Sequence, residues 1–484
     1  MSYGKISTGA KCDMDILREF IREVSSEVNI KVMPRRLSGT IKAVSSKAHT
    51  HRLLIASALC EDSPEIAYNN TSQDVLTTRA CLEALKASLD KPLGGVSSSL
   101  ECGESGATLR FLLPVAAALK DDARFLYSDA VQKRSLMPLI QVMKKHGCAF
   151  YEESAPDTAT KNATTSDKRL KLGDLKASNS ADICQHNTQA QQWLLSVKGS
   201  LQPGIYTLSG GISSQSISGL LFALPLLSGD SEIHFTSPIR AASYVDMTVK
   251  VLKSFGVDVE ATKDEFVPIY KIPGNQKYSL SCKPSKIKIE GDWLNGAVWL
   301  AAGAINGAVS VLGLDYRSYQ AEKEITEIIK NFSGFANPSV KGVVTRTKDL
   351  FAAEVDAANI PDLVPIISVL GCAAYGKTII KNAAGLSPAL IPKRENRLDA
   401  VCKNLSQLGA NIERFDGTLI IRGQGKLKGG TVSSGGDHRL AMALVLAASI
   451  CEEPVVIKGA DAVEKSYPHF FEDFKSLGGE YKII

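Results

Sequence analysis

Six stretches of the chain share one pattern, in which a short polar or glycine-rich turn leads into a long, almost uninterrupted apolar run. They are residues 45–60, 104–119, 212–227, 291–305, 360–374 and 433–449. The apolar runs are rich in Ala and Leu and too long for ordinary strands, so the pattern predicts helices. A helix that is apolar on all sides must be buried. Each run follows residues of the types that cap helix N-termini, namely Ser, Asp, Asn or Gly.

Between these runs lie segments in which apolar and polar residues alternate, as expected for half-buried strands. They include residues 231–237, 376–382, 418–423 and 454–460. Two amphipathic segments, residues 243–260 and 397–413, predict covering helices that end at a Phe-Gly or Leu-Gly step. We therefore expect six repeated units, each with one buried helix and one covering helix against a sheet.

The composition adds few constraints. A chain of 484 residues that is 44% hydrophobic and 22% charged can form two or more domains with sizeable cores. The net charge of +5 is spread along the chain, so we expect neither a nucleic acid nor a membrane surface as partner. The ten cysteines form no CxxC pair and no metal-ligand spacing, which indicates reduced thiols in a cytoplasmic protein. The N-terminus lacks the apolar core of a signal peptide.

Several of the predicted helix starts carry side chains that a cap does not need. These are Lys47, Arg52, Arg110, Gln215, Asp362, His438 and Arg439. Helix N-termini present free N–H groups and the positive end of the helix dipole, so several converging N-termini form an anion site. Arginine adds a planar fork suited to carboxylate or phosphate. Capping alone could explain one such run, but across six runs the pattern favours a ligand rich in negative charge.

The motifs resemble, in order, those of the 5-enolpyruvylshikimate-3-phosphate synthase family, from about residue 36 to the C-terminus. They read "SGTIKAVSSKAHTHR", "GESGATLRFL", "KRSLMPLIQVM", "SGGISSQSISGLL", "SYVDMT", "IEGDWLNGA", "NIPDLVP", "KRENRLDAV", "GGDHRLAMAL" and "EKSYPHFF". The resemblance implies an α/β fold of the enolpyruvyl transferase type. That fold is a two-domain inside-out α/β barrel of six βαβαββ repeats, three per domain, around parallel buried helices.

The resemblance also implies that the chain crosses between the two domains near Ser45 and Glu290. The expected parts are residues 1–30 as an N-terminal extension, 31–45 and 291–484 as domain 1, 46–290 as domain 2, and 153–192 as a polar insertion in domain 2. The active site would lie between the domains, where the helix N-termini meet.

The family transfers the enolpyruvyl group of phosphoenolpyruvate to the 5-hydroxyl of shikimate 3-phosphate and releases phosphate, in the shikimate pathway to chorismate and the aromatic amino acids. The resemblance assigns phosphoenolpyruvate to Lys47, Gly106, Arg134, Gln215, Arg397, Arg439 and Lys465. It assigns shikimate 3-phosphate to Lys47, Arg52, Ser213, Ser214, Gln215, Tyr244, Asp362 and Lys393. It implies no cofactor and no metal, and it favours a monomer.

The reaction needs an acid and a base on either side of one carbon atom. By resemblance, Asp362 would accept the proton of the attacking hydroxyl, although its place after Ile360-Pro361 also fits a helix N-cap. Lys47 and Lys465 are candidate acids where their neighbours lower their pKa values. We expect His438 to be a cap and orienting donor rather than the main base.

Several positions depart from the family pattern. Arg394 stands where the family has a glutamate that takes part in proton transfer, and Glu395 follows one residue late. A shift of one residue redirects a side chain by a large angle, so Glu395 could serve only after a local backbone adjustment. The other departures are Ala48, Ala107 and Ala241 in place of hydroxyl residues, Glu104 in place of asparagine, and Ser135-Leu136 after Arg134.

These losses fall mostly on the acceptor side, which leaves three alternatives open. The chain could transfer enolpyruvyl to shikimate 3-phosphate, it could serve another acceptor, or it could be a non-catalytic anion-binding paralogue.

A related transferase that acts on UDP-N-acetylglucosamine depends on a reactive cysteine in a mobile loop. The corresponding segment here, "GESGATLR", has no cysteine, and nearby Cys102 has a different context.

Overall fold

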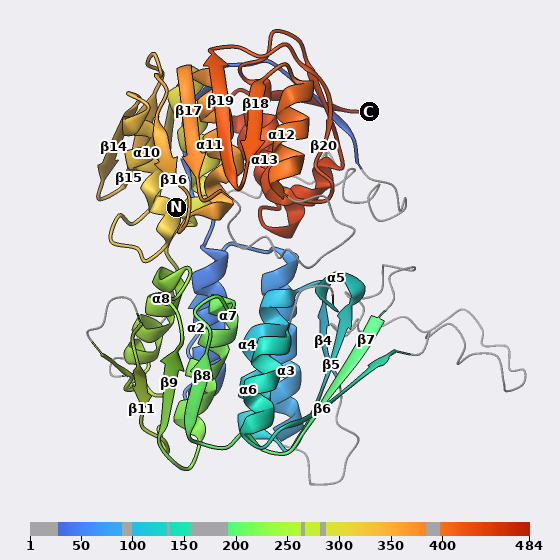
Figure 1. Ribbon diagram of the computed structural model, residues 1–484, viewed down its shortest axis with the longest axis vertical. Helices are drawn as coiled ribbons and strands as arrows, with labels where there is room; N and C mark the ends of the chain where they lie inside the picture. The colour runs from blue at the N-terminus through green and yellow to red at the C-terminus, as the bar shows by residue number, and fades with distance from the viewer. Residues whose placement is uncertain are drawn as a thin grey trace, which may run out of the picture.

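The computed structural model describes residues 28–89, 99–132, 136–155, 192–262, 267–280, 287–383 and 397–484. These residues form a mixed α/β fold of two domains, which lie one above the other in Figure 1. The upper domain contains β1 (Ile30–Met33), β2 (Leu37–Lys42) and all elements from α9 (Trp293–Asn306) onward. The lower domain contains the elements between β2 and α9. Each domain has its own cluster of buried apolar side chains.

The six apolar runs form helices, as their composition predicts. They are α2 (Lys47–Leu59), α4 (Gly106–Leu119) and α7 (Ser214–Ala223) in the lower domain, and α9, α11 (Val364–Ala373) and α13 (His438–Ala448) in the upper one. Most of their residues are buried, including Trp293 and Trp299 of α9. Helices α4 and α7 approach closely at Gly219, where an added Cβ would lie 2.6 Å from the Arg110 carbonyl oxygen. The expectation of buried apolar helices is confirmed.

The described strands form five four-stranded sheets and one two-stranded sheet. In the upper domain the orders are β20 (Gly430–Ser433)-β21 (Val455–Lys458)-β1-β22 (Glu480–Ile483), β14 (Phe335–Ser339)-β15 (Gly342–Arg346)-β13 (Gly307–Leu312)-β2, and β16 (Glu354–Asp356)-β17 (Tyr375–Lys381)-β19 (Thr418–Gln424)-β18 (Asn411–Phe415). In the lower domain they are β4 (Leu100–Gly103)-β5 (Asp122–Ser128)-β7 (Gln192–Lys198)-β6 (Ala149–Ser154), β10 (Glu260–Ala261)-β11 (Tyr270–Ile272)-β9 (Ser231–Phe235)-β8 (Ile205–Leu208), and β12 (Ile287–Lys288)-β3 (Ile66–Ala67). Each four-stranded sheet combines one parallel pair with two antiparallel pairs.

More polar helices complete the two domains. The two that the sequence predicts are α8 (Ala242–Ser254) and α12 (Arg397–Gln407), and a glycine with positive φ follows each, Gly256 at +69° and Gly409 at +96°. Glycine adopts this left-handed conformation without steric cost, which is why these steps end helices. The remaining described helices are α3 (Gln73–Leu89), α5 (Asp129–Gln132), α6 (Met137–Lys145), α10 (Ile325–Asn331) and α14 (Phe470–Ser476), with 3-10 turns η3 (Leu224–Leu226), η4 (Ala321–Glu324), η5 (Pro361–Leu363) and η6 (Ala460–Lys465).

Two segments connect the domains and lie side by side. Ser45 forms a β-bridge with Gly291, and the backbone N–H of Ser46 donates to the Glu290 carbonyl oxygen at 2.8 Å. The backbone N–H of Asp292 donates to Val44 at the same distance. This pairing brings the starts of α2 and α9 together at the crossing between domains.

Candidate functional site

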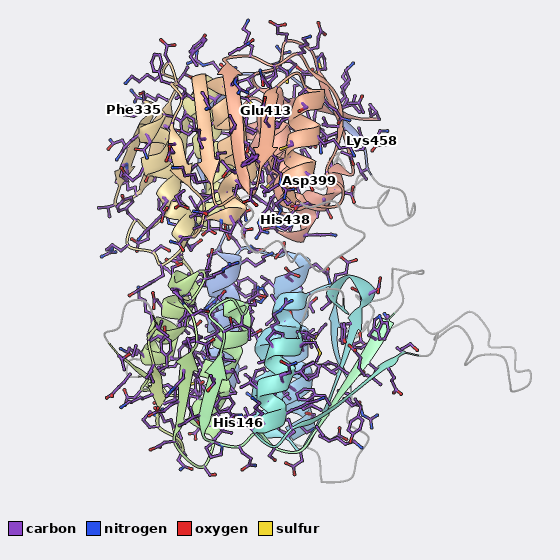
Figure 2. The ribbon with its side chains drawn as sticks, in the orientation of Figure 1. His146, Phe335, Asp399, Glu413, His438 and Lys458 are labelled. Carbon is purple, nitrogen blue, oxygen red and sulfur yellow. The ribbon has the colours of Figure 1, made fainter. Side chains whose placement is uncertain are left out.

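Five of the six apolar helices begin with the side-chain caps that the sequence predicts. Ser46, Ser105, Ser213, Asp292 and Asp437 each accept a hydrogen bond from a backbone N–H in the first turn of the following helix. Figure 1 shows α2, α7 and α4 standing along the length of the lower domain, each with one end toward the upper domain. His438, at the start of α13, lies at the edge of the upper domain that faces them (Figure 2). Polar helix starts from both domains therefore lie near the crossing.

The carboxylate of Asp362 lies between two arginines. One oxygen is 3.0 Å from Arg397 Nη1, and the other is 2.7 Å from Arg439 Nη2. The sequence also allowed Asp362 to be a helix N-cap, and this interpretation is wrong. No side chain caps the turn at Pro361–Leu363 or the start of α11, because the carboxylate is used by the two guanidinium groups instead. All three side chains are partly exposed, so the arrangement can be reached by a ligand.

Asp437 joins the same group and anchors α13. It accepts backbone hydrogen bonds from Arg439 at 2.9 Å and Leu440 at 3.4 Å, and its other oxygen lies 2.6 Å from Arg397 Nε. Burial opposes the charged form of this carboxyl, but Arg397 and Arg439 outweigh it and hold the pKa of Asp437 well below its usual range. Burial likewise disfavours the charged Arg397, yet Asp437 and Asp362 raise the pKa of that guanidinium. Two arginines and two carboxylates thus form one ionised cluster.

His438 is the first residue of α13 and not its cap, so the expectation that His438 caps the helix is wrong. Asp437 takes that place because its shorter acidic side chain reaches the free N–H groups of the first turn. Burial, Arg439 and Lys47 lower the pKa of His438 well below its usual value. The ring is therefore neutral at neutral pH. Its Nε2 atom is buried and has no hydrogen-bond partner among the described residues.

Lys47 begins α2 and brings a cation to the start of that helix. Its ammonium lies 3.0 Å from Asp74 Oδ2, in the first turn of α3, and both side chains are about a quarter exposed or less. Its backbone N–H donates to Asp292 of the upper domain at 3.1 Å. Lys47 also acts electrostatically on His438 across the crossing, since its charge helps to lower the pKa of that ring. Lys47 and His438 are therefore brought together from different domains.

The starts of α4 and α7 lie next to each other. Arg110 Nη1 donates to the Gly106 carbonyl oxygen at 3.0 Å and lies 3.5 Å from Gln215 Oε1. Ser213 accepts from the backbone N–H of Gln215 at 3.3 Å, and Ser214 follows as the first residue of α7. Gly106, Ser213, Ser214 and Gln215 are thus gathered at one place.

Lys465 and Glu104 form an ion pair between the domains. Lys465 ends the turn η6 of the upper domain, and its ammonium lies 3.3 Å from Glu104 Oε2, just before α4 of the lower domain. Both side chains are about half exposed, at 48% and 46%. Glu104, which the sequence marks only as a departure from the family pattern, is therefore the partner of a predicted substrate-binding cation.

Arg52 is enclosed rather than open to a ligand. It is 2% exposed, and its guanidinium donates to Thr248 Oγ1 at 2.7 Å, to the Ala48 carbonyl at 2.8 Å and to the Tyr244 carbonyl at 2.9 Å. Burial lowers the pKa of Arg52 to about 10, so it stays charged at neutral pH. The expected contact of Arg52 with a substrate carboxylate stays a prediction.

Tyr244 reaches across to the upper domain. Its hydroxyl donates to Glu322 Oε2 at 2.6 Å, and Glu322 is 2% exposed. Burial raises the pKa of Glu322 to about 7 against the opposing effect of the Tyr244 hydrogen bond. Burial, followed by Glu322, raises the pKa of Tyr244 well above its usual value, so the phenol remains a neutral donor. Like Arg52, Tyr244 is engaged within the protein.

Three predicted site residues, Arg134, Lys393 and Glu395, lie outside the described residues, as does Arg394. The described part of the chain contains no group of His, Cys, Asp and Glu side chains able to hold a metal ion. None of its helices has the length and apolar character to cross a membrane.

Four acidic partners of the site are not predicted from the sequence. Asp74, Asp437, Glu104 and Glu322 each hold a predicted site residue through an ion pair or hydrogen bond. The only local signal was an acidic residue at or near a helix start, which helix capping and the helix dipole explain equally well.

Comparison with known proteins identifies the family. Residues 32–165 and 178–474 match the family model described as EPSP synthase (3-phosphoshikimate 1-carboxyvinyltransferase). The chain is 35% identical over 467 residues to the 3-phosphoshikimate 1-carboxyvinyltransferase of Clostridium acetobutylicum, covering 93% of this chain and 97% of that one. It is 34% identical to the Clostridium kluyveri protein of the same name, with the same coverage of both chains. This chain belongs to the EPSP synthase family.

Solved structures share the fold. The EPSP synthase of Acinetobacter baumannii superposes with a TM-score of 0.70 at 18% identity, covering 94% of this chain and 100% of that chain. The enolpyruvyl transferase NikO of Streptomyces tendae gives a TM-score of 0.65 at 17% identity, covering 95% and 99%. At such low identity these likenesses concern the fold alone, and they agree with the expected two-domain α/β architecture.

Proposed function

We propose that this chain transfers the enolpyruvyl group of phosphoenolpyruvate to the 5-hydroxyl of shikimate 3-phosphate and releases phosphate. Membership of the EPSP synthase family and the names of its curated relatives support this activity. The observation in this chain that carries the proposal is the position of Asp362 between Arg397 and Arg439. It combines one carboxylate base with two planar cations, as a reaction between an alcohol and an anionic enol phosphate requires.

Phosphoenolpyruvate carries a carboxylate and a phosphate on three carbons, so it needs several fixed donors. The proposed donors are Lys47, Gly106, Arg134, Gln215, Arg397, Arg439 and Lys465. Arg439 keeps one unused donor, because its Nε is buried and has no hydrogen-bond partner among the described residues. The neutral His438 beside Arg439 and Lys47 adds no further charge to this cluster of cations. Each charge-assisted hydrogen bond contributes about 1.5–3 kcal/mol net.

The proposed contacts of shikimate 3-phosphate are Lys47, Arg52, Ser213, Ser214, Gln215, Tyr244, Asp362 and Lys393. The start of α7 supports a phosphate site, since Ser213 and Ser214 stand where free backbone N–H groups and the positive helix end point at an anion. Arg52 and Tyr244 would have to exchange internal partners before they bind a carboxylate, because their present donors are used by Thr248, Ala48 and Glu322.

The proposed chemistry is an addition followed by an elimination. Asp362 takes the proton of the 5-hydroxyl while that oxygen bonds to the middle carbon of phosphoenolpyruvate, and Lys47 or Lys465 gives a proton to the methylene carbon. The tetrahedral intermediate then loses phosphate, and the methyl group returns a proton to a base. Glu395 is a candidate for that base on sequence grounds, and His438 is a poor one because its pKa is low.

We further propose the finer architecture of the family, with six βαβαββ repeats arranged as an inside-out barrel and domain limits at residues 45–46 and 290–291. The common strand pattern of the five four-stranded sheets supports repetition. The separate hydrophobic cores and the paired connections support the limits. A cytoplasmic monomer remains our expectation.

A second candidate function is transfer to another acceptor. Ala241, where a phosphate-binding serine is expected, directly precedes α8 in the N-cap position, with φ at +53° and no side-chain cap. Ala48 likewise offers no hydroxyl beside Lys47. The part of the site proposed for the acceptor substrate therefore lacks two hydroxyl groups. The part proposed for phosphoenolpyruvate keeps its basic side chains.

A screen of saturating acceptors decides between these functions, with phosphate release from phosphoenolpyruvate as the readout. Release only with shikimate 3-phosphate supports the first proposal, and release with a different hydroxyl compound supports the second. Tight binding of phosphoenolpyruvate without release under any condition indicates a non-catalytic paralogue. Arg394→Glu, measured beside the parent, shows whether restoring the family's acid at this position raises turnover.

A further inference from the structure

A row of buried hydroxyl groups runs beneath the starts of α2, α3 and α4. His51 Nδ1 lies 2.8 Å from Thr78 Oγ1, which lies 2.6 Å from Thr108 Oγ1. Thr108 Oγ1 in turn lies 2.8 Å from Ser105 Oγ. All four side chains are almost completely enclosed, with exposed fractions of 0% to 2%. Hydrogen bonds in such a dry setting are strong and fix the groups that share them.

The row ends on the ion pair at the start of α2. The Ser105 hydroxyl donates to the Asp74 carboxylate, whose Oδ2 atom holds the Lys47 ammonium at 3.0 Å. Burial alone would raise the pKa of Asp74, but Lys47 and the Ser105 hydrogen bond lower it to about 2. Asp74 is therefore a carboxylate at neutral pH and can only accept hydrogen bonds.

This carboxylate fixes the direction of every hydrogen bond in the row. A hydroxyl has one hydrogen, and that of Ser105 is used by Asp74, so Ser105 must accept from Thr108. By the same reasoning Thr108 accepts from Thr78, and Thr78 accepts from His51. The His51 ring must then carry its hydrogen on Nδ1. Its other nitrogen, Nε2, is left as a lone pair and has no hydrogen-bond partner among the described residues.

We propose that His51, Thr78, Thr108 and Ser105 are positioning residues that hold Asp74, and through it the Lys47 ammonium, in place at the start of α2. In this chain of hydrogen bonds, which we call the relay, each group donates to the next. The chain begins at the Nδ1–H of His51 and ends at the Asp74 carboxylate. What Lys47 does with a substrate rests on the proposed function. The relay itself does not, because it is defined by contacts within the protein.

The first test reads the His51 ring directly. NMR of the histidine ring nitrogens in the intact chain distinguishes the two neutral forms, and His51→Gln assigns the signal among the seven histidines. We expect His51 to carry its proton on Nδ1 in the parent at neutral pH. Thr78→Val removes the acceptor of that proton and should shift the ring toward the Nε2–H form. A parent ring protonated on Nε2 would reverse the bond directions and overturn the relay.

The second test measures the effect on Lys47 through phosphoenolpyruvate. Thr78→Val should lower kcat/KM for phosphoenolpyruvate roughly tenfold. This is the lower end of the roughly 10- to 100-fold effect typical of residues that orient a functional group from behind. Thr78→Ser keeps the hydroxyl and should restore parental kinetics. Thr378→Val is the matched control, since Thr378 is equally buried and its hydroxyl has no hydrogen-bond partner among the described residues.

The outcomes separate the relay from the proposed function. If Thr78→Ser is as impaired as Thr78→Val, the residue acts through packing and the positioning role is wrong. Parental kinetics in Thr78→Val would also contradict that role. If the parent shows no turnover at all, the proposed function fails, and the NMR measurement still decides whether the relay exists.

Discussion

The carboxylate of Asp292, which caps α9 in the upper domain, accepts a hydrogen bond of 3.1 Å from the backbone N–H of Lys47, the first residue of α2 in the lower domain. The other carboxylate oxygen accepts from the backbone N–H of Asn295 at 2.8 Å. One side chain therefore accepts backbone hydrogen bonds from the first turns of helices in both domains, in addition to the Ser46 cap of α2. It does so beside the two segments that connect the domains. It also fixes the backbone of Lys47, which we propose to bind phosphoenolpyruvate.

Removing this shared cap should destabilise the protein. Asp292→Ala leaves free N–H groups at the starts of two helices, and we expect it to lower the free energy of unfolding by about 1–2 kcal/mol. Asp292→Asn keeps a capping oxygen and should lose less. Urea unfolding measures both, with Asp246→Ala on the exposed face of α8 as control. Equal losses in the Ala and Asn variants would show that the cap is not the cause.

Glu104 should compete with phosphoenolpyruvate for Lys465. Their ion pair is about half exposed, so it is weak and can be replaced by an anionic ligand. Glu104→Gln keeps the shape and removes the charge, and we expect KM for phosphoenolpyruvate to fall about two- to fivefold with kcat little changed. Steady-state kinetics test this, with the exposed Glu101→Gln as control. A raised KM would mean that Glu104 supports binding instead of opposing it.

Glu322 should make stability depend on pH. Burial raises its folded-state pKa from 4.5 to about 7, so the folded protein binds this proton more tightly than the unfolded chain. Its contribution is fully present below about pH 4.5 and is lost as the pH rises through 7, at most about 3 kcal/mol. Glu322→Gln should remove this decline in urea unfolding measured across that range. Tyr244→Phe should move the decline to higher pH, because the Tyr244 hydrogen bond lowers the Glu322 pKa. A decline that persists in Glu322→Gln would assign it to another group.

Much of the fold could be predicted because burial leaves a local pattern. A helix such as α13 has no polar side, so its burial follows from composition alone, and β9, β17, β19 and β21 follow from alternation. The order of the strands does not follow in this way. β1, near the start of the chain, pairs with β21 and β22 near its end. Such pairing depends on contacts between distant segments, which periodicity does not encode.

The basic side chains of the site could be predicted from the sequence, whereas the roles of its acidic side chains were harder to predict. Arg397, Arg439 and Lys47 stand out because a cap does not need them. The sequence allowed Asp362 to be both a base and a helix N-cap, and the structure shows no side-chain cap there, because the carboxylate pairs with the two arginines. The partners Asp74 and Glu104 belong to pairs that form only when helices from different parts of the chain meet.

In the proposed reaction, Asp362, held between Arg397 and Arg439, serves transfer of enolpyruvyl to shikimate 3-phosphate. The most direct measurement is phosphate release from phosphoenolpyruvate, with and without shikimate 3-phosphate, in the parent and in Asp362→Asn. We predict that release in the parent requires the acceptor. The Asn variant should still bind phosphoenolpyruvate but turn over about 10²–10⁴-fold more slowly, as expected when a general base is lost. Release without the acceptor, or an Asn variant as active as the parent, would contradict this account.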